Sequence, residues 1–147
     1  MTTTAPTVGG RAIALAHYAG RAVLETVLSR HGATFQQSVA LRVVALADGP
    51  VERDQVVEQV VGALKNDEAD ARRTIGELIA DGLVAGDGSR LRITDAGREL
   101  YSRVTAETGE ISARIYAGIP AADLEAAGRV LARVTERADA ELAMLKG

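Results

Sequence analysis

Apolar residues recur along the chain at helical spacing in six segments, and a single short stretch alternates with polar residues. The first predicted helix, about Val8–Arg30, is apolar around most of its circumference and therefore requires cover on several sides. Shorter helices are predicted at about 34–47, 52–64 and 68–81. Thr34 and Gln37 have capping-box spacing, which favours a helix start at this point.

The stretch GLVAGDGSRLRIT, residues 82–94, predicts a hairpin. Gly86–Ser89 have the composition of a tight turn. Leu91 and Ile93 alternate with Arg90 and Arg92, so the apolar pair is expected to point inward and the arginines outward.

Two long helices are predicted after the hairpin, one at about 94–117 and a last one that has Pro120 in its first turn and ends at about 146. The last carries a stripe at nearly heptad spacing: Leu124, Leu131, Val134, Ala138, Leu142 and Leu145. At ~1.5 Å per residue each of these helices would exceed roughly 30 Å, more than one small core can cover. We therefore expect a homodimer, in which a second copy of the chain covers the apolar stripes of these helices.

These elements define a mainly α fold with a small β-hairpin wing. We expect a winged helix-turn-helix over about 34–94, flanked by long dimerisation helices at about 8–30 and 94–146. We further expect residues 1–9 to form a flexible tail and residues 10–147 to form a single domain.

Composition narrows the possible functions. The chain has 147 residues, a formal net charge of −3 and no cysteine, which excludes disulfides and thiolate metal sites. It shows no secretory signal and no apolar run near the ~20 residues that span a bilayer, so we expect a cytoplasmic protein with no membrane partner. His17 and His31 have no nearby carboxylate cluster, and no phosphate loop or nucleophile motif occurs, so no metal, cofactor or enzymatic activity is expected.

The run IGELIADGLVAGDGSRLRITDAGREL, residues 75–100, resembles the signature of the multiple-antibiotic-resistance regulator (MarR) family. The family's Leu-x-x-x-Gly-Leu-Val pattern is matched by Leu78–Val84, and its Leu-Thr-x-x-Gly pattern by Ile93–Gly97. The stretch ALRVVALADGPVERDQV, residues 40–56, is also similar to the family, and the likeness extends over about Val8–Leu145.

The resemblance implies a homodimeric, sequence-specific DNA-binding transcriptional regulator, a repressor that a small-molecule ligand releases from a pseudo-palindromic operator. It implies that the first turns of the 68–81 helix enter the major groove and that the wing tip approaches the minor groove. The wing is shorter here than is usual in the family, and Arg90 is the nearest equivalent of the family's Asp-Arg pair.

Candidate DNA-binding residues follow from this placement: Ala69, Asp70, Arg72, Arg73, Thr74, Arg90 and Arg92. Arg73 lies opposite the apolar face of its helix, where it could reach a guanine edge or a phosphate. The residues alone leave a second interpretation open, because Glu77 is four positions away at ion-pair spacing. With an acidic flank and a short wing, the alternative is a winged-helix dimer that binds proteins instead of DNA.

The family binds small, often aromatic acids between its dimerisation helices and its winged helix. Candidate ligand-binding residues are His17, Tyr18, Arg21, Phe35 and Arg42. His17 and Arg21 are helical neighbours that could together hold a carboxylate. The alternative is that His17 lies in an interface and that Arg21 pairs with Glu25.

Overall fold

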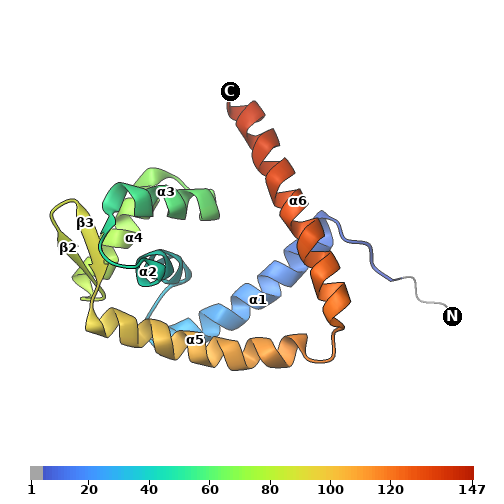
Figure 1. Ribbon diagram of the computed structural model, residues 1–147, viewed down its shortest axis with the longest axis horizontal. Coiled ribbons are helices and arrows are strands. Elements are labelled where there is room, and N and C mark those ends of the chain that lie inside the picture. Colours follow the sequence, from blue (N-terminus) through green and yellow to red (C-terminus); the bar gives the residue numbers. More distant parts are fainter. Residues whose placement is uncertain (1–4) are drawn as a thin grey trace. The chain divides into compact units, whose positions relative to one another are not determined.

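The structure, a computed structural model, describes residues 5–147 (Figure 1). The chain divides into two units, residues up to Gly109 and Glu110–Gly147. Of the expected N-terminal tail, residues 1–4 lie outside the described residues, and residues 5–9 contain no helix or strand.

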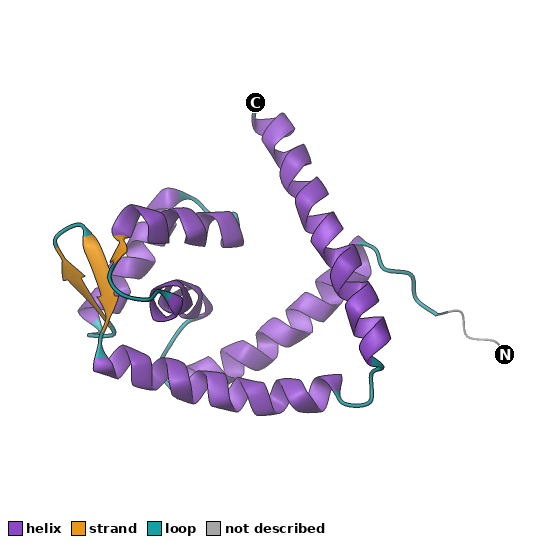
Figure 2. Ribbon diagram, in the orientation of Figure 1, coloured by secondary structure: helices purple, strands orange, loops and turns teal. Residues whose placement is uncertain are grey.

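The secondary structure contains every predicted helix and the hairpin in the predicted order, with one short strand added (Figure 2). The elements are α1 (Gly10–Arg30), α2 (Phe35–Leu46), β1 (Val51–Glu52), α3 (Arg53–Leu64), α4 (Glu68–Ala80), β2 (Val84–Asp87), β3 (Arg90–Ile93), α5 (Asp95–Tyr116) and α6 (Ala121–Lys146). Helix α1 begins two residues later than predicted, because Gly9 is extended and serves as its N-cap. The mainly α fold with a small sheet is confirmed.

The helices of the winged-helix segment begin where the sequence predicts. Thr34 caps α2, and both halves of the capping box form: Gln37 N–H donates to Thr34 Oγ1, and Thr34 N–H donates to Gln37 Oε1. Asp67 caps α4 by accepting from Asp70 N–H at 2.8 Å. Because these side chains satisfy the first free amides, each helix starts at a defined residue.

One apolar core joins the three short helices to the sheet. Its buried members are Ala40, Leu41, Val44, Val56, Val57, Val60, Ala71, Ile75, Leu78, Val84 and Leu91. Helix α4 contributes Ala71, Ile75 and Leu78, the face that its periodicity predicts. The opposite face of α4 is therefore left exposed.

The sheet contains one strand more than the predicted hairpin. Its order is β1-β3-β2, with Val51 opposite Leu91 and Glu52 opposite Arg90. Strand β1 has only two residues, too few for an alternation to be recognised in the sequence. The turn is also tighter than predicted, because Gly86 and Asp87 belong to β2.

The beginning of α5 packs directly on the chain that leads into the hairpin. Thr94 Oγ1 accepts from Gly97 N–H at 3.0 Å and donates to Gly82 O at 2.6 Å. Gly97 is buried, and a Cβ atom there would overlap Leu83 O. A glycine is required at this position because the neighbouring backbone leaves no room for a side chain.

The second unit contains the end of α5 and helix α6. Helix α6 begins after Pro120 and has 26 residues, about 39 Å at the usual rise. None of its residues is buried, and Met144 and Leu145 are 67% and 82% exposed. The apolar stripe of α6 is thus largely uncovered within one chain.

Gly97→Ala should destabilise the fold, although alanine is normally the better helix former. We expect a loss of about 3 kcal/mol, because overpacking against backbone forces a shift of β2 or α5. Gly62→Ala is the matched control: Gly62 lies in α3, and a Cβ atom there would meet nothing within 4 Å. The control should gain about 0.5–1 kcal/mol. Urea unfolding measures both, and a stable Gly97→Ala variant would contradict the packing described here.

Candidate nucleic-acid interface and ligand sites

Arg73 projects from the exposed face of α4. Its side chain is 67% exposed, and the small residues Ala69, Gly76 and Ala80 on this face are exposed as well. Its guanidinium pairs with Asp70 at 2.8 Å, three residues earlier in the helix. The predicted alternative partner, Glu77, instead accepts a hydrogen bond from Gln37 Nε2 at 2.9 Å.

Arg72 joins the first turns of α3 and α4. Its guanidinium lies 2.7 Å from Glu68 and 3.1 Å from Asp54. Hydrogen bonds to Glu68 and then to Asp54 raise the pKa of Arg72 above its usual value. This arginine would have to leave two carboxylates to reach a phosphate.

Thr74 is placed differently from the sequence interpretation. It is only 7% exposed, and its hydroxyl donates to Asp70 O at 3.0 Å within the helix. A buried hydroxyl that is already bonded to the backbone cannot also donate to a phosphate. Thr74 therefore belongs to the packed side of α4, which the sequence analysis misjudged because the residue lies next to the exposed Arg73.

The wing presents both of its arginines outward, as the alternation predicts. Leu91 is buried between Arg90 and Arg92, which are exposed. Arg90 Nε donates to Glu52 at 3.1 Å, and Ser89 Oγ donates to the same carboxylate at 2.8 Å. These hydrogen bonds, first from Ser89 and then from Arg90, lower the pKa of Glu52. The side chain of Arg92 has no polar partner within residues 5–147.

The candidate DNA-binding arginines are thus mostly paired with acids on their own surface. Arg72, Arg73 and Arg90 each contact at least one carboxylate. All these pairs are largely exposed, and exposed ion pairs contribute only about 0–1 kcal/mol. Such pairs can exchange a carboxylate for a phosphate at little cost.

The candidate ligand residues do not form one pocket. Arg21 donates to Glu25 at 3.0 Å, the pairing considered as the alternative, and its guanidinium also lies over the Phe35 ring at 4.2 Å. His17 and Tyr18 are exposed and make a ring contact with each other, at 5.9 Å between centroids. Arg42 lies elsewhere, in an open groove on α2, β1 and α3 lined by Val39, Val43, Leu46, Ala47, Val51, Gln59 and Ala63.

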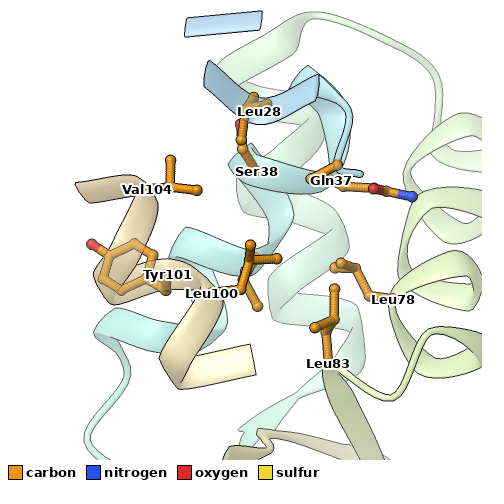
Figure 3. A pocket seen from close by; sticks show the side chains of 10 residues that line it. Leu28, Gln37, Ser38, Leu78, Leu83, Leu100, Tyr101 and Val104 are labelled. Carbon is orange, nitrogen blue, oxygen red and sulfur yellow. The ribbon is translucent and has the colours of Figure 1, made fainter. Parts of the chain in front are cut away.

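A small cavity lies between α2, α4 and α5 (Figure 3). None of the residues that line it was predicted to bind a ligand. Its lining is Leu28, Ala33, Gln37, Ser38, Leu41, Leu78, Leu83, Leu100, Tyr101 and Val104. Its volume of about 20 Å³ is enough for roughly one water molecule. Capping-box spacing marks Gln37 in the sequence, but no local pattern indicates that it also borders a cavity.

Two further findings concern the described residues only. No group of three or more His, Cys, Asp or Glu side chains there could hold a metal ion. None of the helices between residues 5 and 147 has both the length and the apolarity that a membrane crossing needs.

Comparison with solved structures identifies the fold. The Staphylococcus aureus MarR protein in complex with salicylate and kanamycin has a TM-score of 0.75 at 19% identity, over 89% of this chain and 90% of that one. CouR of Rhodococcus jostii RHA1 bound to p-coumaroyl-CoA has a TM-score of 0.72 at 17% identity, over 86% and 90%. A MarR-family protein of Mycobacterium tuberculosis has a TM-score of 0.62 at 21% identity, over 85% and 92%.

The chain therefore has the winged-helix fold of the MarR family, as the sequence motifs indicated. The similar structures include transcriptional regulators rather than enzymes. Searches with protein-family models and against curated proteins find no match for the sequence.

Ser89→Ala should raise the pKa of the Glu52 carboxyl toward its ordinary value of 4.5, because it removes the largest cause of the lowering. A carboxylate with a lowered pKa stabilises the fold above its unfolded pKa, and this contribution is lost as the pH falls through the folded value. An NMR titration of the Glu52 carboxyl measures the shift. Ser102→Ala, an exposed serine on α5, is the control; an unchanged titration in Ser89→Ala would contradict the role of the hydroxyl.

Proposed function

We propose that this protein is a MarR-family transcriptional regulator: a homodimer that binds a pseudo-palindromic DNA operator and acts as a repressor released by a small molecule. The observation that carries the proposal is the exposed face of α4, where Arg73 projects among residues with small side chains. Small neighbours allow a helix to approach a groove closely, and an arginine can then reach a guanine edge. Arg90 and Arg92 on the adjoining wing supply further cations.

Dimerisation is supported by the uncovered apolar residues of the long helices. Leu15 and Tyr18 of α1, Ile115 of α5, and Leu131 and Leu145 of α6 are between 43% and 82% exposed. Large apolar side chains that are left exposed in such number are typical of an interaction surface. A second copy of the chain would cover it and would supply a second α4, so that two half-sites about 10 bp apart can be bound.

A small aromatic or acidic ligand is proposed as the inducer. Two proteins of similar structure have been solved with salicylate and with p-coumaroyl-CoA. In this chain Arg21, stacked on Phe35, and Arg42, in its separate groove, are the candidate cations for a ligand carboxylate. His17 and Tyr18 could contribute ring contacts.

A second function is favoured by one specific observation, the acid partners of Arg72, Arg73 and Arg90. A surface on which cations are matched by carboxylates repels phosphates more than a free basic patch does. A winged-helix dimer with such a surface could bind another protein instead of DNA. Selection of bound duplexes from random DNA separates the two functions, since only the regulator enriches a palindrome.

Arg73→Ala should weaken binding to the selected duplex by about five- to 150-fold, because a bidentate arginine–guanine contact contributes about 1–3 kcal/mol. Fluorescence anisotropy at fixed salt measures the change. Arg103→Ala is the control, since Arg103 pairs with Glu99 on α5 in the same type of exposed ion pair. If Arg73→Ala binds as tightly and as selectively as the unmodified protein, Arg73 does not read the operator.

Leu131→Glu should convert the dimer to a monomer at micromolar concentration, because it places a charge in the apolar stripe of α6. Analytical ultracentrifugation measures the mass. Ala132→Glu adds the same charge one position away, between Glu125 and Asp139 on the polar side of the helix, and should remain dimeric. A dimeric Leu131→Glu variant would place the interface elsewhere.

A further inference from the structure

Gln37 occupies an unusual place for a polar residue. It is only 7% exposed, although it lies in the first turn of α2. The stem of its side chain borders the cavity. The side chain extends away from Leu100 and Tyr101, so its terminal amide points away from these two residues (Figure 3). The amide nitrogen donates to Glu77 on α4 at 2.9 Å, a link across 40 positions of sequence.

The capping box determines which end of this amide faces α4. Thr34 N–H donates to Gln37 Oε1 at 3.1 Å, so the oxygen is committed to the start of α2. The –NH2 group is then directed toward Glu77, a carboxylate that can only accept. The two hydrogen bonds together select one orientation of the amide.

Glu77 is also a potential partner of Arg73. The two residues are four positions apart, the spacing at which helical ion pairs form. Among the described side chains, however, Arg73 pairs with Asp70, and no ion pair joins it to Glu77. The carboxylate of Glu77 is held toward α2 by Gln37.

We propose that Gln37 is a positioning residue for α4: it anchors Glu77 to the start of α2 and so keeps this carboxylate away from Arg73. The inference rests on the proposed DNA-binding function for its effect on operator affinity, but the anchoring itself does not require DNA. The stem of Gln37 also lines the cavity, as does Leu78 of α4, so the cavity wall borders α4 directly and is also linked to it through the hydrogen bond of Gln37 to Glu77.

The test exchanges donor and acceptor. Gln37→Glu preserves the capping box, because Glu is equally suited to its third position, but it opposes two carboxylates. The double variant Gln37→Glu/Glu77→Gln restores one donor and one acceptor in the reverse order. The double variant Gln37→Glu/Glu77→Ala removes the repulsion without restoring the bond. Gln36→Glu, at the exposed neighbouring position, controls for added charge.

Hydrogen exchange of the α4 amides gives the readout that is independent of DNA. Gln37→Glu should accelerate exchange in residues 68–80 about tenfold, since a lost bond to a charged acceptor is expected to have an effect of this order. The reversed pair should return to within about threefold of the unmodified protein, while the Glu77→Ala double variant should stay fast. Gln36→Glu should be unchanged. Unaltered exchange in Gln37→Glu, or equal rescue by both double variants, overturns the proposal.

Operator affinity gives the second readout. Gln37→Glu should weaken binding to the selected duplex about tenfold, and the reversed pair should restore it. If the unmodified protein binds no duplex while hydrogen exchange of the α4 amides changes as expected, the DNA-binding function is refuted. The anchoring of α4 is then still supported. If the operator affinities change as expected but hydrogen exchange of the α4 amides does not, the anchoring of Glu77 by Gln37 is refuted.

Discussion

The burial of one face of α4 is the constraint on which the candidate interface depends. Ala71, Ile75 and Leu78 are at most 2% exposed and pack into the core shared with α2, α3 and the sheet. Burial of such side chains contributes about 1.5–3 kcal/mol for each large one. With that face committed to the core, the rotation of α4 about its axis is determined, and Arg73 is directed to solvent.

The arginines on the exposed face of α4 and on the wing can pair either with carboxylates of the same chain or with an external anion. Every acid that contacts a candidate DNA-binding arginine lies on α4, at the start of α3 or in β1. Because the pairs are exposed, they orient the guanidinium groups without holding them strongly. If the proposed DNA-binding function holds, a partner that supplies several anions in a fixed pattern, as a duplex does, would replace these acids more readily than a single diffusing anion.

Local signals in the sequence predicted most of the fold. Thr34 and Asp67 define helix starts through their own hydrogen bonds, so their roles can be recognised without tertiary information. Strand β1 was missed because its two residues pair only with the distant β3. The periodicity of α4 likewise identified Arg73 as exposed, but it could not reveal which acid Arg73 pairs with.

The candidate sites depend more on tertiary packing, and sequence analysis was correspondingly less successful there. Thr74 is adjacent to an exposed arginine yet faces inward. Arg21 and Arg42 were grouped by chemistry, whereas the structure places Arg21 against Phe35 and Arg42 in a different groove. Glu77 was recognised only as a helical neighbour of Arg73, because its actual partner is 40 residues away.

The close packing of Gly97 on Leu83 has a mechanical consequence. Thr94 N–H donates to Leu83 O, and Thr94 Oγ1 donates to Gly82 O, so the first turn of α5 and the entrance of the hairpin are joined at three neighbouring points. Because the first turn of α5 is closely packed and hydrogen-bonded against residues 82–83, this contact is not suited to act as a hinge. Bending or rotation of the beginning of α5 should therefore move the wing together with it.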